Sequence, residues 1–180
     1  EKESVSYKNI IAERIIFCDG PSSMANPWFS RLPFAPNKGE ALVVEIPGLP
    51  AENIYKRTLS LVPMQQKDIF WIGSAYHWDF DNTDPTPAFR KEAEDLLKSW
   101  LKLPYKVLEH RPGLRPATLE RRPFVGLHPL QPAVGILNGM GTKGCSLAPF
   151  FASQFIAHLL DKQPITAEAD VNRFSKILSR

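Results

Sequence analysis

Short apolar runs closed by turn-forming residues set the pattern of the first part of the chain. They occupy residues 12–18, 40–46, 58–62 and 68–75. The first run ends at Asp19-Gly20-Pro21 and the second at Pro47-Gly48, and a polar loop at 65–68 separates the last two. Runs of this length, rich in β-branched and aromatic residues and bounded by glycine or proline, are typical of strands. The pattern predicts an antiparallel sheet.

The clearest helical pattern follows Thr86. Thr86 is a predicted N-cap, because its hydroxyl oxygen can accept a backbone N–H of the first turn, and Pro87 suits the first helical position. Apolar residues then recur at helical spacing and form one stripe, with charged residues on the opposite face. The stripe comprises Phe89, Ala93, Leu96, Leu97, Trp100 and Leu101. We interpret it as a packing surface and expect the helix to end at Pro104.

The second half of the chain contains further strands and helices. Residues 105–109 and 133–138 are strand candidates. A helix is predicted over residues 147–160, because apolar side chains recur there in steps of four. These side chains are Leu147, Phe151, Phe155 and Leu159. Residues 171–178 predict a short closing helix with Asp170 as its cap.

The composition is that of a globular protein, with 43% hydrophobic and 23% charged residues in a chain of 180. The net charge of +3 is small and the basic residues are scattered, so nothing favours a nucleic-acid partner. Arg121-Arg122 is the one adjacent arginine pair, and a solvated turn explains it as well as an anion site does.

The two cysteines, Cys18 and Cys145, lie far apart in the sequence, and no histidine pair has metal-ligand spacing. We therefore expect no metal site and a reduced, cytoplasmic protein. No apolar run approaches the length of a membrane span, and no signal peptide is recognisable. The chain begins at Glu1 and not at methionine, which suggests a processed protein or a fragment.

Gly139, Gly141 and Gly144 have the spacing G-x-G-x-x-G, with a strand before them and a helix after them. An ordinary dinucleotide-binding unit would continue with a second strand ending in an acidic residue, and here a helix follows instead. We therefore reject that interpretation. Glycines still permit close approach of a ligand, and the following helix N-terminus and Lys143 favour negative charge. The alternative, a plain strand-to-helix turn, stays open at this level.

Several segments in order resemble one family. They are Ala12-Glu-Arg-Ile-Ile-Phe-Cys-Asp-Gly-Pro-Ser-Ser, Pro36-Asn-Lys-Gly-Glu-Ala-Leu-Val-Val-Glu, Gly113-Leu-Arg-Pro-Ala-Thr118, Pro123-Phe-Val-Gly126 and the glycine loop with Leu147-Ala-Pro149. Together they resemble the latter part of the D-amino-acid-oxidase-like family of FAD-dependent amine and amino-acid oxidoreductases, which includes glycine oxidase and sarcosine oxidase. The family's own pyrophosphate-binding glycine motif lies at its N-terminus and has no counterpart in this chain.

The resemblance implies an α+β fold, in which an antiparallel substrate-domain sheet with helices joins an incomplete α/β FAD-binding part. Residues 1–36 and 112–180 would form the partial FAD-binding part, and residues 37–111 the substrate-binding sheet domain. FAD is then the cofactor of the intact protein. We expect a chain without the pyrophosphate cradle to hold FAD weakly and to be inactive by itself.

The resemblance also implies individual roles. Arg115 matches the arginine that binds the substrate carboxylate. The expected cofactor-binding residues are Gly20, Gly139, Met140, Gly141, Thr142, Lys143, Gly144 and Cys145. If a hydride leaves a neutral amine, no side chain has to act as an acid or base, so no catalytic residue is expected. His110 and Arg111 are interpreted as packing or surface residues.

The chain departs from the family pattern in places. Met140 stands where histidine or glycine is common, Glu120-Arg121 replaces the usual Asp-Gly, and Cys18-Asp19-Gly20 forms the turn beside FAD. The substrate predicted from the resemblance is a small amine or amino acid, whose C–N bond is oxidised by hydride transfer to flavin. The alternatives are a non-catalytic binding module that retains the fold and a tRNA-modifying relative. The oligomeric state is not determined.

Three aromatic residues fall in the predicted substrate-domain sheet. They are Trp71, Tyr76 and Trp78. Large aromatic side chains contribute most often to cores, so we expect these to pack inside the domain, although they are also of a kind that lines pockets.

Overall fold

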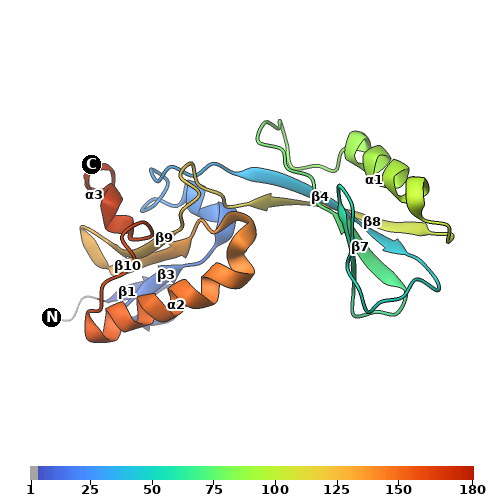
Figure 1. The fold of residues 1–180 in the computed structure, drawn as a ribbon. Coiled ribbons are helices and arrows are strands. Elements are labelled where there is room, and N and C mark those ends of the chain that lie inside the picture. The colour runs from blue at the N-terminus through green and yellow to red at the C-terminus, as the bar shows by residue number, and fades with distance from the viewer. Residues whose placement is uncertain (1–3) are drawn as a thin grey trace. The chain divides into compact units, whose positions relative to one another are not determined.

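The computed structural model describes residues 4–180, which divide into two compact units. The first unit combines the described residues up to Pro36 with Arg115–Arg180, and the second unit is Asn37–Leu114. Figure 1 shows the elements of both units in chain colours. The α+β class expected from the sequence is confirmed, since mainly antiparallel sheets and a few helices make up the described chain.

The first unit is built on a three-stranded sheet. Its order is β3 (Ile15–Phe17), β10 (Gln131–Asn138) and β9 (Phe124–His128). Strand β3 pairs in parallel with β10, whereas β9 pairs with β10 as an antiparallel hairpin. Helix α2 (Gly144–Asp161) covers one face, and Phe151 and Phe155 are buried in the cluster beneath it. The helix lies close at Gly135, where a Cβ would come within 2.7 Å of Ile16 and 3.0 Å of Phe155.

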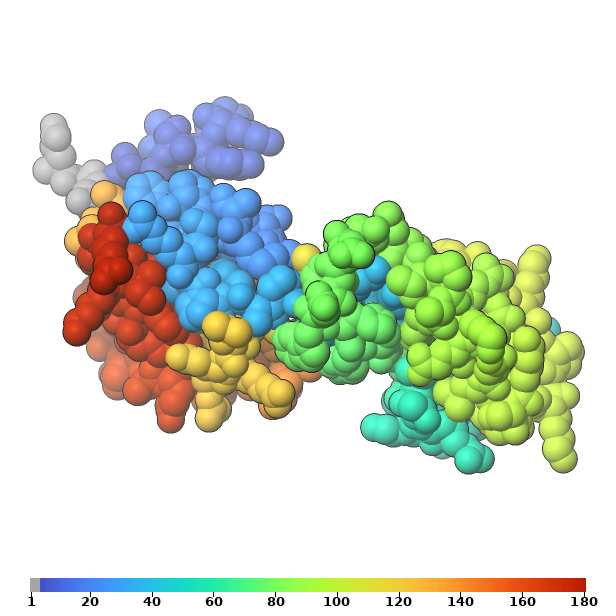
Figure 2. All heavy atoms as spheres, turned by 90° about the horizontal axis from the view of Figure 1, so that it is seen from above, coloured from blue at the N-terminus to red at the C-terminus, as the bar shows by residue number. Residues whose placement is uncertain are grey.

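Short elements complete this unit. Strands β1 (Val5–Tyr7) and β2 (Ile10–Ala12) form a separate hairpin, drawn dark blue in Figure 2 at the surface of the unit. The remaining elements are 3₁₀ helices η1 (Gly20–Ala25), η2 (Gly141–Lys143) and η3 (Val171–Phe174), and helix α3 (Ser175–Leu178). A second buried cluster contains Phe29, Phe124 and Ile136 and packs against Phe174.

The second unit is a five-stranded sheet in the order β5, β6, β7, β4, β8. The strands are β4 (Asn37–Glu45), β5 (Tyr55–Lys56), β6 (Ser60–Pro63), β7 (Ile69–Gly73) and β8 (Lys106–Arg115), the last of which ends at the boundary of the first unit. Helix α1 (Pro87–Trp100) buries Phe89, Ala93 and Leu97 against this sheet, as the apolar stripe predicts. The pairs β4–β7, β6–β7 and β5–β6 are all antiparallel.

A buried ionic cluster fixes the start of helix α1. The Thr86 hydroxyl accepts from Phe89 N–H at 3.3 Å, which confirms the predicted N-cap. Thr86 N–H and Oγ1 in turn donate to the carboxylate of Glu40, at 2.7 and 2.9 Å. Lys38 Nζ and His110 Nε2 lie 3.7 and 2.8 Å from the same carboxylate. Burial alone would raise the pKa of Glu40, but the Thr86 hydrogen bonds, and then Lys38 and His110, lower it, so the carboxylate stays ionised.

Other expectations need correction. Helix α1 ends at Trp100, before Pro104, because Leu101 is already extended. Tyr76 and Trp78 do not pack in a core, since they are 57% and 54% exposed in the segment after β7. Trp71 is half-buried, and its ring lies close to Gly73. Strand β9 and the β1–β2 hairpin have no counterpart in the sequence prediction, because their apolar runs are very short.

Candidate functional site

Three loops of the first unit meet at one edge of its sheet. Because β3 and β10 are parallel, with Phe17 opposite Ile136, the carboxyl ends of both strands lie at this edge. Because β9 is antiparallel to β10, with Phe124 opposite Asn138, the start of β9 lies there too. The turn after β3, the loop before β9 and the glycine loop after β10 are therefore neighbours. Ligands in sheets with parallel strands commonly bind at such a carboxyl edge.

Asn138 connects two of these loops. Its side-chain amide donates to Gly20 O and to Ser23 Oγ, both at 2.8 Å, and its Oδ1 accepts from Gly139 N–H at 2.8 Å. Ser23 also donates to the carboxylate of Asp19. Asn138 and Ser23 are both buried, so the network fixes the Gly20 turn against the start of the glycine loop. Sequence reasoning missed Asn138, although a polar residue at the end of an apolar strand and before a glycine is a recognisable signal.

The first two glycines of the loop shape the backbone. Gly139 and Gly141 have φ values of 80° and 54°, which side-chain-bearing residues rarely adopt. A Cβ on Gly139 would also lie 2.7 Å from Thr118 Cγ2. Gly141 N–H donates to Pro116 O at 3.2 Å, so the loop rests on the segment after β8. Glycine is therefore required at position 139, whereas at position 141 it relieves backbone strain without being demanded by space.

The third glycine has a different role. Gly144 has an ordinary helical φ of −53°, and no heavy atom lies within 4 Å of the position of a Cβ there. It opens α2, whose N-cap residue Lys143 makes no side-chain capping bond. The first N–H groups of a helix have no partner within the helix and favour an electron-rich group. The space beside Gly144 and these donors suit an electron-rich or anionic group.

The other predicted loop residues differ in exposure. Thr142, Lys143 and Cys145 are exposed, and Cys145 is a free thiol. Met140 is half-buried and packs against the apolar cluster beneath α2. Its side chain therefore serves the core, and only its backbone remains for contact with a ligand. That explains how methionine is accommodated at this position without a hydrogen-bonding side chain.

Arg115 ends strand β8 beside this loop. Its carbonyl oxygen accepts from Ala117 N–H at 2.8 Å, and Ala117 O accepts from Ala35 N–H at 2.8 Å. Pro116 O is the acceptor that holds Gly141. The structure thus brings the Arg115 segment, the glycine loop and the Gly20 turn together in one unit, although they are far apart in the sequence.

Titratable groups at this edge are few. Burial, and then the charge of Asp19, raises the pKa of the Cys18 thiol, so Cys18 stays protonated and is a poor nucleophile. Within residues 4–180 no three His, Cys, Asp or Glu side chains are grouped closely enough to hold a metal ion. What the edge offers is backbone N–H donors, a helix N-terminus and cationic side chains.

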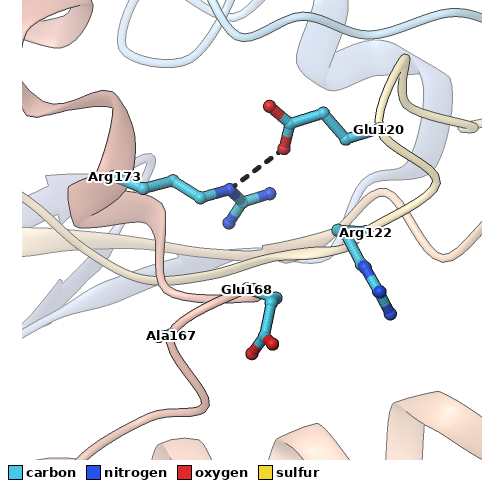
Figure 3. Close-up of a pocket in the computed structure, with 5 residues that line it drawn as sticks. All are labelled: Glu120, Arg122, Ala167, Glu168 and Arg173. Atoms are coloured by element: carbon cyan, nitrogen blue, oxygen red, sulfur yellow. Dashed lines mark hydrogen bonds and ion pairs between the residues drawn. The ribbon is translucent and has the colours of Figure 1, made fainter.

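A second feature of the first unit is an open hollow of about 520 Å³ near its C-terminal elements, shown in Figure 3. It is lined by Glu120, Arg122, Ala167, Glu168 and Arg173. Arg173 is held firmly: Nε lies 3.3 Å from Glu120, its other nitrogens donate to the carbonyls of Asp170 and Pro123, and its guanidinium stacks on two phenylalanine rings. Burial lowers the pKa of Arg173, and its acidic neighbours oppose that shift only in part.

Comparison with known proteins identifies the family. The sequence profile of the family described as FAD dependent oxidoreductase (DAO) matches residues 2–158. The chain belongs to this family. The resemblance seen in the sequence motifs is thereby confirmed, and FAD is confirmed as the cofactor of the family. Which residues of this chain contact FAD stays a prediction.

Solved structures share the fold. Iminodiacetate oxidase from Chelativorans sp. BNC1 superposes with a TM-score of 0.70 and 21% identity over 88% of this chain and 45% of that one. Glycine oxidase from Bacillus cereus has a TM-score of 0.69 and 17% identity, over 86% of this chain and 44% of its own. L-proline dehydrogenase from P. horikoshii has a TM-score of 0.69 and 15% identity, over 96% of this chain and 50% of its own. The chain therefore spans about half the length of these structures or less. Within residues 4–180, no helix combines the length and apolar character needed to cross a membrane.

Proposed function

We propose that this chain supplies the flavin-ring and substrate-carboxylate contacts of an FAD-dependent enzyme that oxidises the C–N bond of an amine or amino acid. The observation that carries the proposal is the convergence of the Arg115 segment with the glycine loop through the bond from Gly141 N–H to Pro116 O. A carboxylate-binding cation then lies beside backbone donors suited to a flavin. The complete enzyme would convert the amine to an imine, while the flavin accepts a hydride.

The glycine loop would stabilise negative charge. When bound, FAD supplies the redox chemistry, and the reduced flavin ring gains electron density at one edge. The free N–H groups at the start of α2 and the cation of Lys143 are suited to that edge. Asn138 holds the loop in shape through its hydrogen bonds to Gly20 and Gly139, so the donors are arranged before the ligand arrives.

Arg115 would orient the substrate. A guanidinium can hold a carboxylate with two parallel hydrogen bonds, which fixes the direction of the neighbouring carbon as well as its position. The names of similar proteins support this substrate class. Iminodiacetate oxidase, glycine oxidase and L-proline dehydrogenase are each named for an amine or amino acid that carries a carboxylate.

The test uses the whole flavoprotein that contains this chain. We expect it to be yellow with bound FAD, and Arg115→Ala to lower kcat/KM for a carboxylate-bearing amine by about a hundredfold while flavin content stays the same. Arg111→Ala is the matched control, because Arg111 is exposed on the same strand and pairs only with Glu109 among the described residues. A colourless protein that FAD does not reconstitute would refute the enzyme and favour the binding module. Unchanged affinity for carboxylates in Arg115→Ala would remove Arg115 from the site.

A further inference from the structure

A tight turn before β9 carries an arginine in a backbone conformation that favours glycine. Arg121 has φ 54°, and its N–H donates to Thr118 O at 3.0 Å, which closes a four-residue turn. Thr118 Oγ1 reinforces the turn, since it donates to Arg122 O at 2.8 Å and accepts from Arg122 N–H at 3.0 Å. Any residue other than glycine, asparagine or aspartate pays an energetic penalty in this region. Residues in this region cluster at functional sites, and Lys8, Asp68 and Lys162 adopt it elsewhere in this chain at turns and at a helix end.

The turn lies directly beside the glycine loop. Thr118 is buried, and its methyl group occupies the space where a Cβ on Gly139 would be. The ends of a four-residue turn are less than about 7 Å apart, so Arg121 Cα lies within that distance of Thr118 Cα. A ligand that rests on the glycine loop is therefore within reach of an arginine side chain. Figure 2 shows residues near 120, in amber, at the surface of the unit.

The charges of this turn are not balanced locally. Glu120 pairs with Arg173 and so does not neutralise Arg121. In the described part of the chain, the exposed Arg121 side chain makes no ion pair, ring contact or hydrogen bond, and its backbone N–H accounts for its one bond. Arg122 lines the hollow with Glu168, on the side of Arg173. The loops at this edge thus carry Arg115, Arg121 and Lys143, and Asp19 is bound to Ser23.

We infer that Arg121 binds a second carboxylate of the substrate, so that the enzyme acts on an amine bearing two carboxylates. The inference rests on the proposed function, in which Arg115 binds the first carboxylate. The turn beside the glycine loop thus carries an exposed arginine that a substrate with one anionic group would not require. This role would explain the strained backbone at Arg121. Glycine would form the turn more easily, but only arginine would bind the carboxylate.

Binding to the whole flavoprotein tests this inference. Succinate and butyrate are the probes, since they share a four-carbon chain and differ in one carboxylate, and the change in flavin absorbance reports their Kd. We expect succinate to bind about tenfold more tightly than butyrate. Arg121→Gln should abolish this preference, and Arg122→Gln, the charge-matched control, should retain it.

A measurement of thermal stability separates the backbone strain at Arg121 from its role in binding a carboxylate. In the 180-residue chain, Arg121→Gly should raise the Tm by about 2–4 °C, because glycine adopts the turn conformation without penalty. The same change in the flavoprotein should abolish the succinate preference. Equal affinities for the two probes in the wild type, or a preference that survives both Arg121 variants, would overturn the inference and leave the proposed function intact. A protein without flavin would refute both.

Discussion

At the scale of single residues, the three glycines of the loop have different structural roles. Gly139 has a positive φ and no room for a Cβ, because Thr118 fills that space. Gly144 has a helical φ and open space beside it. The first glycine is therefore a folding requirement, whereas the third leaves room for a ligand. A sequence motif treats them as equivalent.

Gly139→Ala should destabilise the chain by about 2–4 kcal/mol, since it adds both backbone strain and a steric clash. Urea unfolding measures this change in the free energy of unfolding. Gly144→Ala is the matched control and should change stability by less than about 0.5 kcal/mol. Equal losses in the two variants would contradict the distinction between them.

His128 makes the first unit sensitive to pH. It is buried at the end of β9 against the rings of Trp28 and Phe29, and its Nδ1 accepts from Leu130 N–H. Burial lowers its pKa below the usual 6.5. The unfolded chain therefore binds this proton more readily than the folded chain, so stability falls as the pH drops through 6.5 and levels off below the folded pKa.

The measurement is the free energy of unfolding between pH 7.5 and 5.5. The wild type should lose stability over this range, and His128→Gln should lose less, because it removes the titrating group. Parallel pH profiles for the two proteins would show that His128 does not titrate differently on unfolding.

At the scale of elements, the start of α1 depends on a buried carboxylate. Glu40 accepts two hydrogen bonds from Thr86 and lies beside Lys38 and His110, all within the second unit. Its side chain has no exposed surface. Removing one member of a buried ionic cluster leaves the others uncompensated, and that is more costly than losing an exposed pair.

Glu40→Gln should therefore destabilise the second unit by about 3 kcal/mol, since Lys38 loses its counter-charge. Glu94→Gln offers the control, because Glu94 lies partly exposed on α1 and pairs with Arg90 and Lys98. That change should cost about 1 kcal/mol or less. Urea unfolding followed by tryptophan fluorescence measures both changes in the free energy of unfolding. A loss no larger for Glu40 than for Glu94 would contradict the role of the cluster.

At the scale of the whole molecule, the chain matches only part of the length of its structural relatives. It spans 45% of iminodiacetate oxidase and 44% of glycine oxidase. Helix α2 also keeps apolar side chains on its outer face, with Ile156 and Leu160 exposed. A helix that is apolar on most sides is usually covered in its native setting.

We expect the 180-residue chain to bind FAD about a hundredfold more weakly than the whole flavoprotein, because it would lack at least two charge-assisted hydrogen bonds to the cofactor. Quenching of flavin fluorescence measures both dissociation constants, and free riboflavin added to the chain serves as the control for nonspecific binding. Equal affinities for FAD would show that these residues suffice to hold the cofactor.

The sequence by itself determined the elements with strong local signals. Thr86, Pro87 and the apolar stripe defined α1, because capping and helical periodicity act over a few residues. The β-branched runs at 40–46 and 68–75 predicted β4 and β7. Ordered motifs such as Gly113-Leu-Arg-Pro and the glycine loop indicated the family, since they depend only on residue type and spacing.

Tertiary structure alone decided how these parts meet. Only the pairing of β3, β10 and β9 shows that the Gly20 turn, the Thr118 turn and the glycine loop share one edge, because strand partners far apart in sequence leave no local signal. The roles of Asn138 and Glu40 were hidden for the same reason, since their hydrogen bonds reach residues 118 and 46 positions away. Burial likewise decided between the two interpretations of Tyr76 and Trp78, because exposure depends on the packing of the whole unit.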